Sequence, residues 1–357
     1  MDYDKLLTCP PYGLDDAKKD KIFSRLLSAL TDRHRRECAL YDRMAGLLGD
    51  AAGTVREVEQ IPMVPVSLFK KIKLSSIPEE KCFKVVTSSG TAGQRPSKIF
   101  LDRKTAAWQQ LTLERIVSDF IGGQRLPMLI IDSPGVLRDR SLFSARGAGI
   151  LGFSIFGAKK QYALTERMEL DYDGVKRFLL DAGDSPVLVF GFTYIIWKHF
   201  YQALKASGRT LPLNHGFLIH GGGWKKLEAQ AVSPENFRES LRQICGLRNV
   251  RNYYGMAEQT GCIYMECSQG HLHASSYSDI RIRSMDNFSC CKIGTEGIIQ
   301  VLSPMAWSYP GHSILTEDKG ILLGDGDCPC GRKGKYFRIT GRIPAAEIRG
   351  CSDTYEA

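Results

Sequence analysis

The sequence lacks the long apolar runs that would place it in a membrane. No stretch approaches the roughly 20 consecutive apolar residues that a membrane-spanning helix needs. The longest runs, Pro127–Ile131 and Val187–Phe192, are typical of buried strands. The N-terminus also lacks a basic segment followed by an apolar one, as a secretory signal would have. We therefore expect no membrane span and a cytoplasmic location.

Dense, short-loop cysteine spacing is absent as well, although the 357 residues include eleven cysteines. In a reducing compartment such cysteines are thiols, metal ligands or nucleophiles. The net charge of +9 comes from Lys and Arg spread along the chain, without the basic block that is typical of nucleic-acid-binding proteins. We expect no specific nucleic acid partner, and an anionic nucleotide and an acidic carrier protein fit this charge better.

What is present indicates a layered globular fold. With 43% hydrophobic and 24% charged residues, the chain can build a sizeable core. Apolar strand candidates alternate with helical segments, which predicts an α/β fold with ligands at the strand ends. The expected strands are 83–87, 127–131, 187–190 and 216–219, and the expected helices are 105–120, 173–182, 194–206 and 234–245.

The two ends of the chain have other patterns. Residues 14–48 have apolar side chains at helical spacing, which predicts a helical cap, and residues 61–69, with two prolines, predict an extended connector. From about Asp279 the pattern changes to short β-like runs and then to a Gly- and Cys-rich tail. We predict a large α/β domain over residues 1–278, with the cap and the ligand site, and a small β-rich subdomain over residues 279–357.

A loop rich in Gly, Ser and Thr follows the first of these strands. Residues 87–98 read T-S-S-G-T-A-G-Q-R-P-S-K. Glycines let backbone N–H groups turn toward an anion, hydroxyls add donors, and Lys98 or Arg95 adds positive charge. This predicts a polyphosphate-binding loop, although a surface turn has a similar composition. The spacing G-x-x-x-x-G-K-[ST] of a Walker loop is absent.

This string resembles the phosphate loop of the adenylate-forming superfamily, which includes acyl-CoA synthetases, luciferases and adenylation domains. Residues 252–259, N-Y-Y-G-M-A-E-Q, resemble its Y-G-x-T-E segment. Residues 316–318 and 339–342 resemble its ribose-binding and hinge segments, and the four motifs occur in the family's order. The nearest resemblance is to LuxE-type acyl-protein synthetases. The next is to phenylacetate–CoA ligases, which share the C-x-C-G-R run at residues 328–332.

The resemblance implies that the protein uses ATP and Mg²⁺, and it gives the motif residues their roles. Glu258 would hold Mg²⁺ against the phosphates, since a hard cation takes carboxylate oxygens. Asp318 would accept from both ribose hydroxyls, and Arg342 would approach the phosphate or ribose. The implied nucleotide-binding residues are Thr87, Ser88, Ser89, Gly90, Thr91, Gly93, Gly221, Gly222, Tyr254, Gly255, Asp318 and Arg342, with Lys98 as a catalytic cation.

Two features depart from the family pattern. Ala257 stands where the family has a threonine, so its hydroxyl would come from Thr260 or Thr87, or be missing as in a non-catalytic homologue. Larger members continue into a C-terminal domain with a lysine that assists adenylation, and most of that domain has no counterpart here. The short tail, Lys98 or Lys225 would then supply the cation.

Two pairs of soft ligands point to a metal site. Cys267 with His273, and Cys328 with Cys330, are enough for a closed structural zinc site. His271 is an alternative ligand, and scattered reduced thiols are the other interpretation.

A further cysteine, Cys351, has a different implied role. In LuxE-type enzymes a cysteine near the C-terminus accepts the acyl group, and a neighbour such as Arg349 would favour its thiolate. An unreactive surface thiol is the alternative.

These observations predict that the protein activates a carboxylic acid, of the fatty acyl class, as acyl-AMP and transfers it to a protein thiol. The acceptor would be an acyl carrier protein or a reductase. A CoA ligase is the alternative enzyme, and a zinc-stabilised basic module that binds nucleic acid is the alternative that is not an enzyme. Residues 190–197, apolar and aromatic, either line an acyl pocket or pack in the core.

Overall fold

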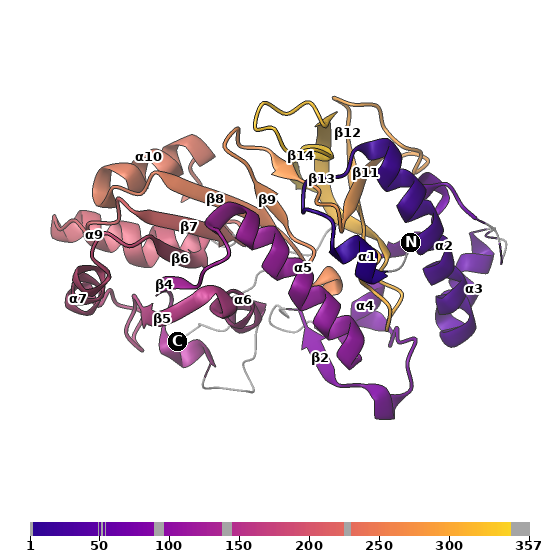
Figure 1. The fold of residues 1–357 in the computed structure, drawn as a ribbon, viewed down its shortest axis with the longest axis horizontal. Helices are drawn as coiled ribbons and strands as arrows, with labels where there is room; N and C mark the ends of the chain where they lie inside the picture. Colours follow the sequence, from indigo (N-terminus) through magenta and orange to yellow (C-terminus); the bar gives the residue numbers. More distant parts are fainter. Residues whose placement is uncertain are drawn as a thin grey trace. The chain divides into compact units, whose positions relative to one another are not determined.

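The chain divides into two compact units (Figure 1). The computed structural model describes residues 3–48, 50, 53, 55–88, 96–137, 145–224 and 230–343. Unit 1 comprises Met1–Ser88, Gly93–Asp119 and Gly255–Glu347, and unit 2 comprises Ser89–Ala92, Phe120–Tyr254 and Ile348–Ala357. Strands β11 to β14 therefore share a unit with the N-terminal helices, and the division at residue 279 into domain and subdomain stays a prediction.

Unit 2 contains a parallel sheet with the strand order β5-β4-β6-β7-β8. All six residues of the central strand β6 are buried, as expected where helices cover both faces of a parallel sheet. The strands are β4 (Leu126–Ile131), β5 (Gly157–Tyr162), β6 (Val187–Phe192), β7 (Gly216–Gly221) and β8 (Asn249–Tyr254).

Two helices of unit 2, α7 and α10, begin at side-chain capping residues. The Ser233 hydroxyl accepts from Asn236 N at 3.2 Å before α10, and Gly246 ends that helix in the left-handed conformation at φ 74°. Asp171 caps α7 in the same way, accepting from Gly174 N at 3.0 Å. The helices are η3 (Pro134–Leu137), α6 (Ala145–Phe153), η5 (Ser154–Phe156), α7 (Tyr172–Ala182), α8 (Thr193–Ile195), the π-helix η6 (Ile196–Tyr201), α9 (Gln202–Ser207) and α10 (Pro234–Cys245).

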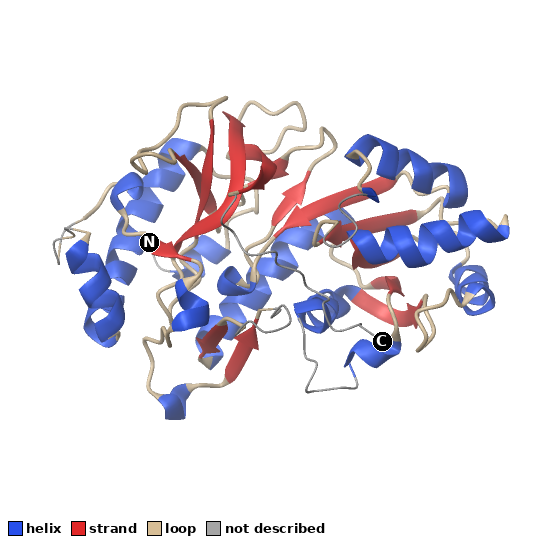
Figure 2. Cartoon of the chain, turned by 180° about the vertical axis from the view of Figure 1, so that it is seen from behind, coloured by secondary structure: helices blue, strands red, loops and turns tan. Residues whose placement is uncertain are grey.

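Unit 1 contains an antiparallel sheet with the order β11-β12-β13-β14-β10-β9, and β1 adds to β13 in parallel. Figure 2 draws the strands of the chain in red and the helices in blue. Strands β2 and β3 form a separate antiparallel pair. The strands are β1 (Val64–Pro65), β2 (Lys84–Thr87), β3 (Lys98–Leu101), β9 (Tyr264–Glu266), β10 (Leu272–His273), β11 (Asp279–Arg283), β12 (Glu296–Leu302), β13 (Ser313–Asp325) and β14 (Lys335–Arg342).

Helix α2 carries the apolar face that the N-terminal sequence predicts. Phe23, Leu27 and Leu30 are fully buried, and the Asp15 carboxylate accepts from Lys18 N at 3.0 Å to cap the helix. No described helix is both long and apolar enough to cross a membrane. The helices of unit 1 are α1 (Tyr3–Leu7), α2 (Asp16–Glu37), α3 (Ala39–Leu47), η1 (Val58–Gln60), α4 (Leu68–Lys71), η2 (Glu79–Lys81), α5 (Arg103–Ile121, whose last two residues belong to unit 2) and η8 (Ala257–Gln259).

The α/β fold class is confirmed, and each strand and helix expected between residues 83 and 245 is present. The connector at residues 61–69 was predicted only in part, because β1 and the first turn of α4 lie there. The short β runs expected from about Asp279 are present as β11 and β12. The tail expected after them was wrong, since β13 has 13 residues and β14 has eight. Polar residues interrupt both strands in sequence, and pairing with neighbouring strands keeps them extended.

A buried ion cluster joins helix α2 to strands β11 and β14. The side chain of Asp279 is fully buried and lies 3.2 Å from Lys19 Nζ and 3.6 Å from Lys335 Nζ, and it also pairs with Arg281. Arg281 pairs in addition with Asp20 at 2.8 Å. Burial alone would raise the pKa of Asp279, but the three cations hold it below its usual value.

Asp279→Asn should lower the free energy of unfolding by about 3–5 kcal/mol at pH 7, because the buried cations would lose their carboxylate. The pKa of Asp279 is lower in the folded than in the unfolded state. Its contribution is therefore present above the unfolded-state pKa of about 4 and is lost as the pH falls through the folded-state pKa. Urea denaturation of both proteins should give a difference that shrinks between pH 7 and pH 3.

Asp181→Asn is the matched control, because it breaks an exposed ion pair with Lys159. The side chain of Asp181 is 64% exposed and that of Lys159 is 66% exposed. This substitution should change the free energy of unfolding little. An effect of Asp279→Asn no larger than this, or one that grows toward low pH, would contradict the role given to the cluster.

Candidate functional site

Strands β2 and β3 flank the segment that was predicted to bind phosphates. Thr87 ends β2 and pairs with Lys98, which begins β3. Beside them, Ser88 N donates to Ser97 O at 3.1 Å, and Ser97 N donates to Ser88 Oγ at 2.9 Å. The structure therefore brings three of the predicted residues, Thr87, Ser88 and Lys98, to one end of this strand pair, with Lys98 exposed.

Several predicted residues lie outside the described part of the chain, so their roles stay predictions. They are Ser89, Gly90, Thr91, Gly93, Arg95, Lys225, Arg349 and Cys351.

Glu258, the predicted Mg²⁺ ligand, lies in the buried turn η8. The residue is 2% exposed, and its Oε1 has no hydrogen-bond partner among the described residues. A buried carboxylate oxygen without a partner is unfavourable unless a cation or a donor completes it. Glu258 therefore fits a Mg²⁺ ligand, because a hard cation takes carboxylate oxygens.

The turn around Glu258 uses a hydroxyl that was a candidate replacement for the family's threonine. Thr260 Oγ1 donates to Ala257 O at 2.8 Å, which closes the turn. Thr87 stays the other predicted replacement. Gly255, just before the turn, is exposed.

The predicted ribose-binding residues meet on neighbouring strands. Asp318 of β13 and Arg342 of β14 are register partners, and Arg342 Nε donates to Asp318 Oδ1 at 3.2 Å. Arg342 Nη2 also donates to Glu317 Oε2 at 3.3 Å. Both Asp318 and Arg342 are partly exposed, so a carboxylate acceptor and a rigid set of donors are accessible at one place. This arrangement suits ribose hydroxyls and phosphate oxygens.

In unit 2, the predicted glycines lie at the C-terminal end of strand β7. A Cβ at Gly221 would lie 2.8 Å from the Tyr253 ring, and a Cβ at Gly222, where φ is 85°, would lie 2.9 Å from the Phe192 ring. Only glycine fits both positions. Tyr254 lies at the corresponding end of β8, half-buried. The structure thus gives the two glycines a packing role, and their contact with adenine stays a prediction.

The aromatic segment at residues 190–197 is mainly buried. Phe190 stacks on Phe153 with ring centroids 4.3 Å apart, and Trp197 stacks on Tyr201 at 4.4 Å. These contacts account for the aromatic composition by core packing. A role in lining an acyl pocket stays a prediction.

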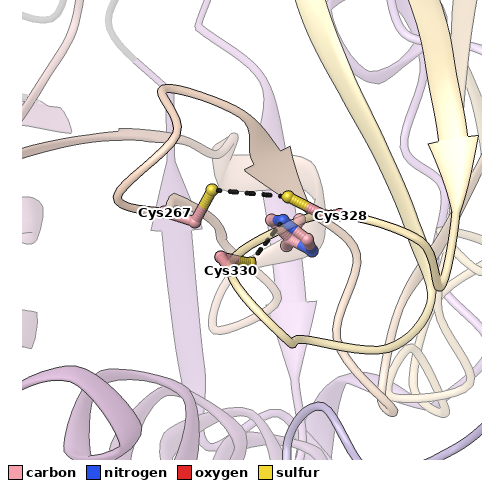
Figure 3. A group of neighbouring side chains, drawn as sticks. Cys267, Cys328 and Cys330 are labelled. Carbon is pink, nitrogen blue, oxygen red and sulfur yellow. Dashed lines mark hydrogen bonds between the residues drawn. The ribbon is translucent and has the colours of Figure 1, made fainter.

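Four predicted metal ligands form a single cluster in unit 1 (Figure 3). Cys267 lies in the turn that follows β9, and His273 is the last residue of β10. Cys328 and Cys330 lie in the turn between β13 and β14. One ligand atom from each residue lies within 4.8 Å of all the others. The pairing of β10 with β14 thus brings together cysteines that are more than fifty positions apart in the sequence.

The distances in the cluster fit zinc better than a disulfide. Cys267 Sγ lies 3.9 Å from Cys328 Sγ, and Cys330 Sγ lies 3.4 Å from His273 Nε2. Zn–S bonds of about 2.3 Å and Zn–N bonds of about 2.0 Å at tetrahedral angles separate ligand atoms by about 3.5–3.8 Å. His271 Nδ1 is also only 3.4 Å from Cys328 Sγ, so the alternative ligand is present too. These residues could hold zinc with no open position for chemistry.

Two residues that support Glu258 could not be recognised from sequence patterns. Tyr309 Oη donates to Glu258 O at 2.8 Å, and Gln109 Nε2 donates to Tyr309 Oη at 3.1 Å. Tyr309 lies in a Ser-Tyr-Pro-Gly run that is typical of a turn, and Gln109 lies in a helix far away in the sequence. Only the fold reveals that both are buried against the turn η8.

Comparison with known proteins places the chain in a family. The family described as acyl-protein synthetase, LuxE, matches residues 2–357. A long-chain-fatty-acid–luciferin-component ligase from Vibrio harveyi is 22% identical over 351 residues, covering 94% of this chain and 87% of that protein. The ligase of the same name from Aliivibrio fischeri is 20% identical over 312 residues, covering 83% and 78%.

Solved structures with a similar fold are adenylate-forming ligases. An open conformation of 2-hydroxyisobutyryl-CoA ligase with 2-HIB-AMP and CoA has a TM-score of 0.68 at 16% identity, covering 94% of this chain and 77% of that one. ATP-bound MatB from Rhodopseudomonas palustris has a TM-score of 0.50 at 16% identity, covering 75% and 49%. The fold is thus that of adenylate-forming ligases, and the family match extends over all but the first residue. The chain belongs to the LuxE family of acyl-protein synthetases and is a ligase.

Proposed function

We propose that this protein activates a fatty acid with MgATP to give acyl-AMP and pyrophosphate, and then transfers the acyl group to a protein thiol. The observation that carries the proposal is the buried Oε1 of Glu258, which has no partner among the described residues and belongs to a family motif. The family match supports ATP-dependent acyl activation, and the names of the bacterial relatives support a long-chain fatty acid. A cytoplasmic location is part of the proposal.

In the first half-reaction, a carboxylate oxygen of the acid attacks the α-phosphorus of ATP. The bond from that phosphorus to the bridging oxygen breaks, and pyrophosphate leaves with the electron pair. Asp318 and Arg342 would orient the ribose, Lys98 would add positive charge near the phosphates, and Glu258 would hold Mg²⁺. When bound, Mg²⁺ neutralises phosphate charge, and the protein supplies positioning and electrostatic stabilisation.

In the second half-reaction, a thiolate attacks the acyl carbonyl carbon and AMP leaves. Cys351 is the proposed first acceptor, and an acyl carrier protein or a reductase is the proposed final one. A CoA thiol is the competing acceptor, and the similarity in fold to 2-hydroxyisobutyryl-CoA ligase is the observation that favours it. Either thiol gives a thioester, so the nature of the acceptor must be tested directly.

Carboxylate-dependent exchange of labelled pyrophosphate into ATP tests the first half-reaction. In a panel of fatty, aryl and amino acids, we expect exchange with long-chain fatty acids. Glu258→Gln should lower the exchange rate at least about 100-fold, because the charge that holds Mg²⁺ is removed. Glu114→Gln, on the exposed face of helix α5, is the control and should exchange normally. If the wild-type protein exchanged with no acid and instead bound nucleic acid with steep salt dependence, the ligase proposal would fail.

Cys351→Ser separates the two acceptors. With radiolabelled fatty acid and ATP, the denatured wild-type protein should retain the label as a thioester, and Cys351→Ser should lose it. Cys290→Ser, which changes an exposed cysteine, is the control and should keep the label. When CoA is also added, release of labelled acyl-CoA with no labelled protein at any time would establish the CoA ligase alternative.

We also propose that Cys267, His273, Cys328 and Cys330 bind one structural zinc ion. Metal analysis of the wild-type protein should find one zinc ion per chain. The variant Cys328→Ser should contain no zinc and should unfold at a temperature several degrees lower, since binding a structural metal is coupled to folding. Cys245→Ser changes a buried thiol outside the cluster and should retain zinc. Equal zinc content in the two variants would rule the site out.

A further inference from the structure

A buried loop lies between strands β12 and β13, next to the turn that contains Glu258. Of residues 303–312, only Trp307 is partly exposed, and the rest are buried. Loops normally lie at the surface, where water satisfies their backbone groups. A loop buried over this length needs a structural or functional reason, and its hydrogen bonds indicate which parts of unit 1 it joins.

Tyr309 connects this loop to Glu258. Its hydroxyl donates to the main-chain carbonyl of Glu258 at 2.8 Å and accepts from Gln109 Nε2 at 3.1 Å. Gln109 Nε2 also lies 3.4 Å from Met305 O. Complete burial raises the pKa of Tyr309 far above its usual value, so the hydroxyl remains a donor at any working pH. The direction of the carbonyl of Glu258 is thus fixed by a donor that is itself held in place.

The residue after Glu258 is anchored to the same loop. Gln259 Nε2 donates to Gly311 O at 2.8 Å and to Val301 O at 3.3 Å. A Cβ on Gly311 would lie 2.1 Å from the Tyr309 ring and 3.0 Å from Glu258 O, so the close approach of loop and turn requires glycine. Hydrogen bonds therefore hold two successive residues of the turn against this loop.

The loop also contacts the strand that leaves the predicted phosphate-binding segment. Ser308 Oγ donates to Phe100 O of β3 at 2.8 Å, and Ser308 O accepts from Ser76 N at 2.8 Å. The same loop thus holds β3, which begins at Lys98, and the turn of Glu258. A rigid element that contacts both sets the position of one relative to the other.

We propose that Tyr309 is a positioning residue that fixes the main chain of Glu258 so that its buried carboxylate is oriented toward Mg²⁺. The proposal rests on the proposed adenylation and deepens it, because it names the group that holds the carboxylate in place. Catalytic carboxylates must be held within a fraction of an ångström, and the residues that lock them are part of the site. Gln109 and Gly311 support Tyr309 from either side.

Tyr309→Phe tests this, with Tyr264→Phe as a matched control. Tyr264 is also buried in unit 1, and its hydroxyl also donates to a main-chain carbonyl, that of Asp279 at 3.0 Å. Three readouts are compared: the unfolding temperature without ligand, its increase on adding ATP with Mg²⁺ or with EDTA, and pyrophosphate exchange as a function of Mg²⁺ concentration.

We expect both variants to unfold at similarly reduced temperatures without ligand. Tyr309→Phe alone should need at least about 5-fold more Mg²⁺ for half-maximal exchange. The additional rise in its unfolding temperature that Mg²⁺ gives in the presence of ATP should be mostly lost. The rise that ATP gives in EDTA should be unchanged. Wild-type Mg²⁺ dependence in a folded Tyr309→Phe protein would overturn the positioning role. If the wild-type protein itself shows no exchange, the proposed adenylation fails instead, which is a separate outcome.

Discussion

The burial of Asp279 among Lys19, Arg281 and Lys335 is the interaction on which the rest of unit 1 depends. It joins a helix from the start of the chain to strands near its end. Removing one charged partner from a buried ion cluster of this kind is destabilising. Strands β2 and β3, the turn η8 and the strands β13 and β14 belong to the same compact unit as this ion cluster. That unit contains Glu258, Asp318 and the metal cluster.

Within this frame several polar groups of the site have partners. The carbonyl of Glu258 is bound by Tyr309, Arg342 is paired with Asp318, and the thiols of the cluster face one another at metal-ligand distances. Oε1 of Glu258 differs, since it is buried and has no partner in the described part of the chain. A fold that holds the backbone of a carboxylate so firmly and leaves its oxygen unsatisfied is prepared for a cation.

Much of this could be predicted from the sequence, and the limits have physical causes. Helix α10 was predicted at its observed bounds, and in the structure Ser233, Pro234 and Gly246 mark its ends locally. The four residues of the Cys/His cluster were predicted as candidate ligands because few residue types bind zinc. Strands β13 and β14 and the support from Tyr309 could not be predicted, since both depend on partners distant in the sequence. The packing of Gly222 against Phe192 is likewise visible only in the fold.

The central claim is that Glu258 holds the metal ion of a nucleotide in an acyl-adenylating ligase. The most direct measurement is anomalous diffraction from crystals grown with Mn²⁺ and a non-hydrolysable ATP analogue. We predict an anomalous peak within coordination distance, about 2.2 Å, of a Glu258 carboxylate oxygen, between it and the phosphates, with the ribose against Asp318. A nucleotide bound with its metal peak elsewhere, and the Glu258 carboxylate still without a partner, would contradict the account.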